Sequence, residues 1–145
     1  MLNWLVIGIG DITIKRVLPA ILAEPRSRLV GLVTRNKEKA APYAVPAWTD
    51  LNQALRESGC DAVYVGTPVL LHAEQTIASL RAAKQVLCEK PAAMNYAEAC
   101  AMQQVAVETG RLLGVAYYRR MYPKIERAKR LMEQGAIGRV VFAEF

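Results

Sequence analysis

The chain has few of the residues that build metal centres and disulfide frameworks. Its 145 residues include three cysteines, without a C-x-x-C pair, and one histidine. These counts argue against a disulfide scaffold and a zinc site and favour a reducing compartment. No apolar run reaches the roughly 18 residues of a membrane span, and the apolar stretch at the N-terminus is too short for a signal peptide. We therefore expect a cytoplasmic protein without a membrane partner.

Composition and charge describe a soluble globular domain with excess positive charge. The chain is 53% hydrophobic and 22% charged, with a formal net charge of +6, and it is long enough for one domain with its own core. Seven Lys/Arg and three Glu lie in residues 115–145. A solvated helix face is the favoured interpretation, and a phosphate-bearing ligand or an acidic partner is the alternative. Stacking aromatics and a known docking motif are lacking, which argues against nucleic acid.

Short apolar runs alternate with segments of helical period along the chain. Strands are predicted at residues 3–9, 28–34, 61–66, 85–89, 112–117 and 139–145. Helices are predicted at residues 12–23, 37–41, 71–83, 95–109 and 123–134. This alternation, with strands that read as continuous apolar runs, predicts an α/β fold with a doubly wound parallel sheet covered on both faces.

Single residues mark the ends and irregularities of these elements. Pro19 predicts a kink or a break in the first helix. A further helix, capped by Thr49 or Asp50, is predicted to run to residue 55, and Gly110 is predicted to end the helix at residues 95–109.

The first predicted strand leads through a turn with two glycines into a helix. Residues 8–13 read GIGDIT. In the dinucleotide fingerprint, the first glycine permits the tight turn and the second lets the backbone approach a pyrophosphate at the helix N-terminus. Thr13 replaces the third glycine, so we expect helix and strand to approach less closely. A Rossmann-type dinucleotide site is predicted here, and a tight turn without a ligand is the alternative. The predicted contact residues are Gly8, Gly10, Asp11 and Ile12.

The end of the second strand favours NADP over NAD. A carboxylate at this point would bond the two ribose hydroxyls of NAD. The sequence instead gives Thr34 and Arg35, with no acid until Glu38. Thr34 can hydrogen-bond a 2′-phosphate, and Arg35 can pair with it or stack on the adenine. A surface arginine without a ligand is the alternative for Arg35.

Four segments together resemble a known family. They read VYVGTP at residues 63–68, VLCEKP at 86–91, VAYYRRMYP at 115–123 and GAIG at 135–138. In this order and spacing, and with His72 between the first two, they resemble the nucleotide domain of the glucose–fructose oxidoreductase / inositol dehydrogenase / MocA family. The resemblance covers essentially the whole chain.

The resemblance implies an NAD(P)-dependent oxidoreductase that acts on a sugar, a cyclitol or a related polyol. Lys90 would then bond the reacting oxygen and stabilise charge during hydride transfer. In the family, a cis peptide bond often precedes the proline that Pro91 matches, which would aim Lys90 into the cleft. Glu89 would orient the nicotinamide ribose or Lys90 itself. Without the resemblance, Glu89 and Lys90 would be interpreted as the surface end of a strand.

Further matching positions complete the predicted site. Thr67 and Pro68 end the strand that should face the nicotinamide half of the cofactor. His72 matches a position near the cofactor, and its alternatives are to cap its helix or to pack beneath the loop. Tyr118 and Arg119 match the substrate side, with a salt bridge at the rim as the alternative.

The sequence also differs from the family in several respects. Val69 stands where the family commonly has Asn, and Tyr118 stands at another frequent Asn. Family members carry a second domain with a catalytic histidine, which no residue here matches. We therefore expect residues 1–120 to form the NAD(P)-binding domain, residues 121–145 to lead toward a substrate domain, and the chain alone to be catalytically incomplete. A non-catalytic dinucleotide-binding or interaction module is the alternative. The apolar residues Val140, Val141, Phe142 and Phe145 would favour association into a homo-oligomer.

Overall fold

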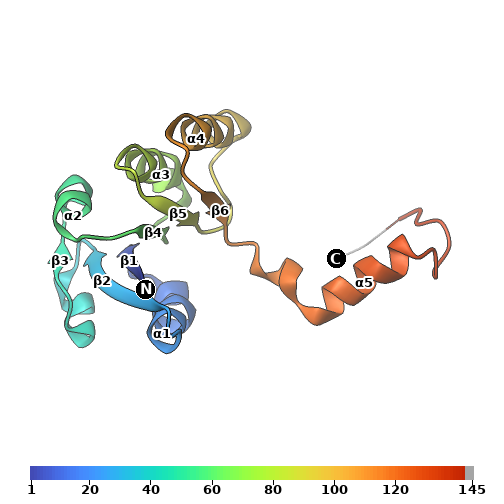
Figure 1. Cartoon of the computed structure of the whole chain (residues 1–145), viewed down its shortest axis with the longest axis horizontal. Helices are drawn as coiled ribbons and strands as arrows, with labels where there is room; N and C mark the ends of the chain where they lie inside the picture. The colour runs from blue at the N-terminus through green and yellow to red at the C-terminus, as the bar shows by residue number, and fades with distance from the viewer. Residues whose placement is uncertain (143–145) are drawn as a thin grey trace.

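The computed structural model describes residues 1–142, which contain one six-stranded parallel sheet (Figure 1). The order of its strands is β3-β2-β1-β4-β5-β6. The order reverses between β1 and β4, as in doubly wound Rossmann folds, so the predicted fold class is confirmed. The strands are β1 (Leu2–Ile7), β2 (Ser27–Val33), β3 (Ala47–Trp48), β4 (Ala62–Val65), β5 (Gln85–Cys88) and β6 (Leu113–Val115).

Helices cover both faces of the sheet (Figure 1). One face carries α2 (Leu51–Glu57), α3 (His72–Arg81) and α4 (Tyr96–Thr109), and the other carries α1 (Leu18–Ala23) and the 3-10 helix η2 (Lys37–Tyr43). Side chains along β1, β4 and β5 alternate between two core clusters, as the pleat requires. None of the helices within residues 1–142 has the length and apolar character needed to cross a membrane.

The first helix contains a wide turn before Pro19. Residues 11–12 are α-helical, Thr13–Val17 form a π-helical segment, η1, and α1 begins at Leu18. Pro19 therefore lies in the first turn of α1, where a missing N–H is tolerated. The irregularity that the sequence predicts takes the form of a π-helical turn, and the helix continues through the proline.

Caps fix the ends of two helices where the sequence predicts them. The Asp50 side chain accepts a hydrogen bond from the Gln53 N–H at 2.6 Å and begins α2. Asn95 caps α4 in the same way. Gly110 ends α4 with φ +63, a conformation that glycine adopts without strain.

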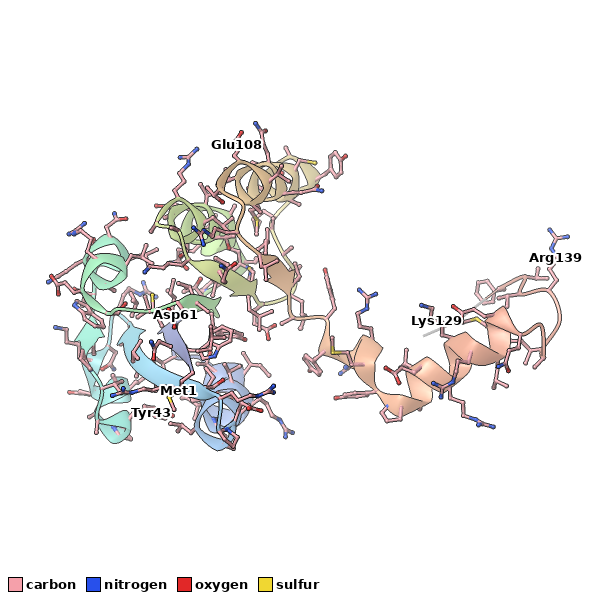
Figure 2. All side chains as sticks on the ribbon, in the orientation of Figure 1. Met1, Tyr43, Asp61, Glu108, Lys129 and Arg139 are labelled. Carbon is pink, nitrogen blue, oxygen red and sulfur yellow. The ribbon has the colours of Figure 1, made fainter. Side chains whose placement is uncertain are left out.

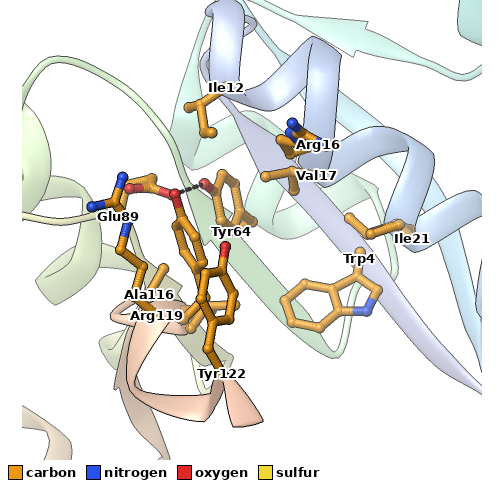
Figure 3. Close-up of a pocket in the computed structure, with 13 residues that line it drawn as sticks. Trp4, Ile12, Arg16, Val17, Ile21, Tyr64, Glu89, Ala116, Arg119 and Tyr122 are labelled. Atoms are coloured by element: carbon orange, nitrogen blue, oxygen red, sulfur yellow. Dashed lines mark hydrogen bonds between the residues drawn. The ribbon is translucent and has the colours of Figure 1, made fainter. Parts of the chain in front are cut away.

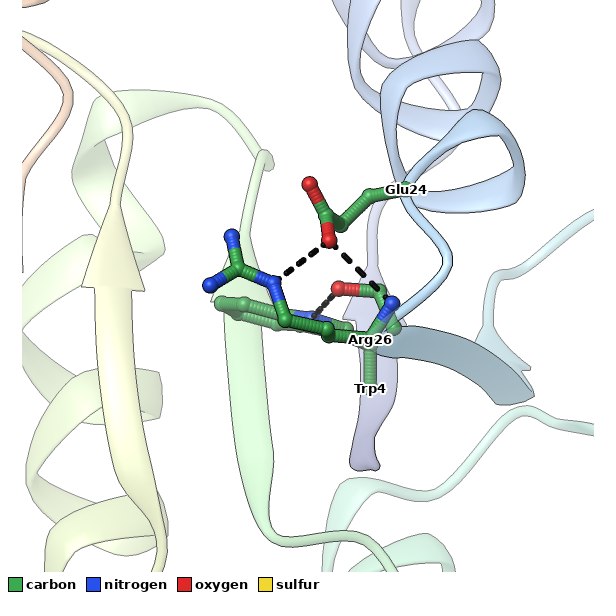
Figure 4. Close-up of polar contacts among 4 residues, drawn as sticks. Trp4, Glu24 and Arg26 are labelled. Atoms are coloured by element: carbon green, nitrogen blue, oxygen red, sulfur yellow. Dashed lines mark hydrogen bonds and ion pairs between the residues drawn. The ribbon is translucent and has the colours of Figure 1, made fainter.

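Polar contacts hold the connection from α1 to β2 (Figure 4). The Trp4 Nε1–H donates to Ser27 Oγ at 3.2 Å, and the Arg26 Nε–H donates to Glu24 Oε1 at 2.8 Å. The first contact ties the indole of β1 to the start of β2. It therefore supports the pairing of β1 with β2.

The chain after β6 leaves the sheet (Figure 1). It forms a 3-10 helix, η4 (Tyr118–Met121), and α5 (Pro123–Glu133), neither of which contains a buried residue. Figure 2 shows Lys129 on α5, the helix that lies apart from the sheet. Lys129 pairs with Glu133 at 3.7 Å across one helical turn. The exposed cations of α5 agree with the favoured interpretation of a solvated helix face.

The strand predicted at residues 139–145 is wrong for residues 139–142, which are irregular. A strand needs a neighbour for its backbone hydrogen bonds, and this part of the chain lies beyond α5, away from the sheet edge (Figure 1). The rest of the predicted strand, residues 143–145, lies outside the described residues. The boundary predicted at residue 120 stays a prediction.

Candidate functional site

Gly8 lies where the chain after β1 comes close to the chain after its parallel neighbour β4. It has φ +86, and its N–H donates to the Val33 carbonyl at 2.9 Å. A Cβ atom at this position would lie 2.8 Å from the carbonyl oxygen of Gly66. Both the left-handed backbone and the close approach to Gly66 therefore require glycine.

Gly66 gives the room that a third glycine in the turn would give. Thr13, which stands at that position, is fully buried. A Cβ atom at Gly66 would lie 2.8 Å from Thr13 Oγ1. The helix and β4 pack closely because the small residue lies on the strand side of the contact.

A cavity of about 480 Å³ lies along this edge of the sheet. Three segments line it: the glycine turn, the end of β2 and the loop after β4. Six of the predicted cofactor residues meet here, and they are joined by Asn36, Lys39 and Gln75. The six are Gly8, Gly10, Thr34, Arg35, Thr67 and Pro68.

The cavity is positively charged at the end of β2. Arg35 and Lys39 line it, and none of its described lining residues is an Asp or a Glu. Glu38 lies outside it, and its N–H is capped by the Asn36 side chain at 2.9 Å. The prediction did not include Lys39, because Arg35 lies before η2 and no local pattern indicates that both side chains reach the same cavity.

The Thr34 hydroxyl is engaged in its own turn. Its Oγ1 accepts from the Asn36 N–H and donates to the Asn36 carbonyl, both at 3.2 Å. Both hydrogen bonds are long and go to a residue two positions away. The hydroxyl, which lies on the cavity wall, can therefore exchange Asn36 for another hydrogen-bond partner. Its main role in the free protein is to shape the chain from β2 into η2.

Asp11 and Ile12 do not line this cavity. Asp11 is exposed, and Lys15 lies 2.7 Å from its carboxylate. The hydrogen bond and charge of Lys15, with the charge of Lys39, lower the pKa of Asp11 below its ordinary value. Ile12 lies on the α1 side of the sheet, where it lines a second cavity with Glu89.

Lys90, Tyr118 and Arg119 are brought together after β5 and β6. They line a cavity of about 360 Å³ with Ala116, Tyr117 and Arg120. Lys90 is exposed, and the Lys90–Pro91 peptide bond is cis. The structure thus joins the predicted catalytic lysine and the predicted substrate-side residues in one hollow.

A buried hydrogen bond fixes the Glu89 side chain, which lies on the α1 side of the sheet (Figure 3). The Tyr64 hydroxyl donates to Glu89 Oε1 at 2.8 Å, and the Lys90 N–H donates to Oε2 at 2.9 Å. Burial, and then the bond to Glu89, raise the pKa of Tyr64 well above its ordinary value. Both side chains line a cavity of about 580 Å³ together with Tyr118 and Arg119. The prediction included Glu89 but not Tyr64, because nothing local pairs residues so far apart in sequence.

His72 lies beneath the loop after β4. It is 1% exposed, and its Nε2 lies 2.8 Å from the Thr67 carbonyl oxygen. Nδ1 lies 2.9 Å from the Pro91 carbonyl oxygen. The ring therefore contacts the two loops that carry Thr67 and Lys90 and lines none of the three cavities.

The chain matches a family and several of its members. The model described as "Oxidoreductase family, NAD-binding Rossmann fold", the Gfo/Idh/MocA family, matches residues 2–117. An oxidoreductase named P35 from Formosa agariphila is 31% identical over 148 aligned residues, which cover 99% of this chain and 46% of that protein. A 1,5-anhydro-D-fructose reductase from Ensifer adhaerens is 34% identical, with 99% and 44% covered.

A solved structure has the same fold. A variant of a 3-ketoreductase from Actinomadura kijaniata, in complex with TDP-benzene and NADP, superposes with a TM-score of 0.88 at 31% identity. The superposition covers 96% of this chain and 46% of that one. The chain thus spans less than half the length of the relatives it matches. By the matched model and these relatives, the chain belongs to the Gfo/Idh/MocA oxidoreductase family and carries its NAD-binding Rossmann fold.

Proposed function

We propose that the chain is the cofactor domain of an NAD(P)-dependent oxidoreductase that prefers NADP. The observation that carries the cofactor preference is the cavity end with two cations, Arg35 and Lys39, and no lining carboxylate. A ribose diol is held by a carboxylate at this point, whereas a 2′-phosphate is held by cations. The 3-ketoreductase variant from Actinomadura kijaniata, whose solved structure contains NADP, is consistent with this assignment.

The glycine turn fits a dinucleotide. An ideal Cβ at Gly10 has no atom within 4 Å, so the second glycine opens onto free space. Behind it begins a helix whose first amides point outward without intrahelical partners, which suits a pyrophosphate. Gly8 and Gly10 would hold the pyrophosphate, Arg35 and Lys39 the 2′-phosphate, and Thr67 and Pro68 the nicotinamide half. The negative charge of Asp11 is offset by its ion pair with Lys15.

Lys90 is proposed to act on the substrate. The nicotinamide of the bound cofactor supplies or accepts the hydride. Lys90 is exposed in the hollow that Tyr118 and Arg119 also line, so its ammonium can donate to the reacting oxygen and stabilise developing negative charge. Glu89, held by Tyr64, fixes the Lys90 backbone through its N–H. A sugar-, cyclitol- or polyol-like substrate is proposed because the relatives include a reductase of 1,5-anhydro-D-fructose.

The test is calorimetric titration of the 145-residue chain with NADPH and, separately, with NADH. We expect tighter binding of NADPH. Arg35→Ala and Lys39→Ala should each weaken NADPH binding roughly 10- to 100-fold, the worth of a charge-assisted hydrogen bond, and leave NADH binding nearly unchanged. Lys37→Ala is the matched control, since Lys37 begins η2 and does not line the cavity.

Other outcomes separate the parts of the proposal. Equal binding of both cofactors would remove the NADP preference and keep the cofactor site. Binding of neither by a folded chain would favour a non-catalytic module of the same fold. Lys90→Ala should leave NADPH affinity nearly intact, because none of the proposed phosphate contacts involves it, and should abolish turnover wherever the complete enzyme is assayed.

A further inference from the structure

His72 joins the two loops that flank the proposed reaction centre. It is the only histidine of the chain, it begins α3, and it is 1% exposed. Its Nε2 contacts the carbonyl oxygen of Thr67 after β4, and its Nδ1 contacts that of Pro91 after β5. One buried ring therefore bridges the carboxyl ends of two neighbouring strands.

Both partners of the ring are acceptors. Carbonyl oxygens cannot donate a hydrogen bond, and a neutral imidazole carries only one N–H. A neutral ring would bond one carbonyl and turn a lone pair toward the other at less than 3 Å. A buried acceptor left without a donor is costly. The imidazolium carries two N–H groups and satisfies both carbonyl oxygens, so the geometry fits the doubly protonated ring.

We infer that His72 is a positioning residue whose doubly protonated ring clamps the Thr67 loop to the Pro91 loop and so sets Lys90 relative to the dinucleotide site. The consequence for Lys90 rests on the proposed function, whereas the protonation of the ring does not. Gln75, three residues after His72, adds to the clamp, because its Oε1 accepts a hydrogen bond from the Thr67 hydroxyl at 2.6 Å. The first turn of α3 thus holds Thr67 by both backbone and side chain.

The ring has no carboxylate partner among the described residues. No salt bridge within residues 1–142 involves His72, and Glu89 accepts from two other donors. Burial raises the pKa of the Cys88 thiol to about 11, beyond the range in which histidine titrates. The groups that face the two ring nitrogens are therefore the two carbonyl oxygens. The elements that contact α3 are η3, α2, α4, β4 and β5. The ionisable groups on α3, on these elements and directly after β5 are Glu74 and Arg81 on α3, Arg56 and Glu57 on α2, Tyr64 on β4, Cys88 on β5, Glu89 and Lys90 after β5, and Tyr96, Glu98, Cys100 and Glu108 on α4.

The first test is NMR of the 145-residue chain with ¹⁵N-labelled histidine at neutral pH. A single histidine gives one pair of ring nitrogen signals, so no assignment is needed. We expect each of the two nitrogens to show a directly bonded hydrogen. One protonated and one bare nitrogen would overturn the inference. No cofactor is present, so this result is independent of the proposed function.

Raising the pH in the same sample tests the coupling of the loops. Removal of one ring proton breaks one of the two hydrogen bonds. The backbone amide signals of Thr67 and Val69 on one side, and of Lys90 and Ala92 on the other, should then shift with the same midpoint as the ring signals. A ring that titrates while either loop stays unmoved would contradict the clamp.

Substitution tests the positioning role. His72→Phe keeps a flat ring without donors, and we expect NADPH to bind roughly tenfold more weakly, as for the loss of one buried hydrogen bond. His72→Gln, whose amide can donate to one carbonyl, should recover part of that loss. Glu74→Gln, exposed on the same helix, is the matched control. A folded His72→Phe variant with unchanged NADPH affinity would overturn the role; if that variant does not fold, the NMR of the unmodified chain decides.

Discussion

The edge of the sheet that carries the proposed cofactor and substrate sites is built in opposite ways at its two ends. At the end of β2, Arg35 and Lys39 are exposed, and the hydrogen bonds of the Thr34 side chain stay within two residues of it. At the ends of β4 and β5, the polar groups are buried and reach far along the chain. There Tyr64 bonds to Glu89, 25 positions away, and His72 contacts Pro91, 19 positions away.

The exposed end therefore suits the binding of a charged ligand, and the buried end suits the fixing of loop positions. Exposed cations attract a phosphate and remain hydrated without it, so they add little to stability. Buried hydrogen bonds hold loops in place, and breaking one leaves an unsatisfied group in the interior. Substitutions at the end of β2 should therefore change binding alone, and those at β4 and β5 should change stability as well.

The largest effect is expected where the two ends meet, at Gly8. Gly8→Ala places a Cβ 2.8 Å from the Gly66 carbonyl oxygen on a backbone with φ +86, which should lower the free energy of unfolding by about 2–5 kcal/mol. Gly59→Ala is the control, because Gly59 has φ +62 but no atom near its ideal Cβ, so only about 1–2 kcal/mol is expected. Urea unfolding measures both. Equal losses would show that the close approach to Gly66 is not the reason why position 8 requires glycine.

Cys88 tests the buried end at alkaline pH. Burial raises its thiol pKa to about 11, so the folded protein keeps a proton that the unfolded chain has already lost. Its contribution to stability is complete below about pH 9 and is lost as the pH rises toward about 11, by about 2–3 kcal/mol in all. Cys88→Ala should flatten this part of the profile, and Cys100→Ala, at a half-buried site, should not. Parallel profiles for Cys88→Ala and the unmodified chain in urea unfolding would refute the assignment.

Tyr64→Phe breaks one contact of the buried end and keeps the ring. The Glu89 carboxylate loses the donor at 2.8 Å, and we expect about 1–3 kcal/mol less stability. Tyr117→Phe, at a half-exposed ring, should leave the melting temperature unchanged. If thermal unfolding gave the same midpoint for both variants, the Tyr64–Glu89 bond would contribute nothing to the fold.

The smallest effect concerns the exposed end and leaves stability untouched. Raising the ionic strength from about 0.01 M to about 0.15 M shortens the screening length from about 30 Å to about 8 Å. NADPH affinity should fall several-fold over this range while NADH affinity changes less, and Arg35→Ala should reduce the difference. Calorimetric titrations at the two salt concentrations measure it. A salt response equal for both cofactors would place the selective charges elsewhere.

Much of the fold was predictable because its signals are local. The apolar runs gave five of the strands in the parallel sheet, and Asp50 and Asn95 cap helices where short-range hydrogen bonding predicts. The strand predicted from residue 139 failed at residues 139–142, because a strand also needs a neighbour, which an apolar run cannot reveal.

The sequence by itself determined the alternation of strands and helices, the glycine turn and the position of Arg35 and Lys90 at strand ends, because each depends on residues close together in the chain. Only the tertiary structure decided that Gly66 makes room for Thr13, that Lys39 joins Arg35 and that Tyr64 holds Glu89. The order β1-β4-β5 brings distant strand ends side by side. Contacts between them depend on how the sheet is assembled, and no local pattern along the chain encodes that.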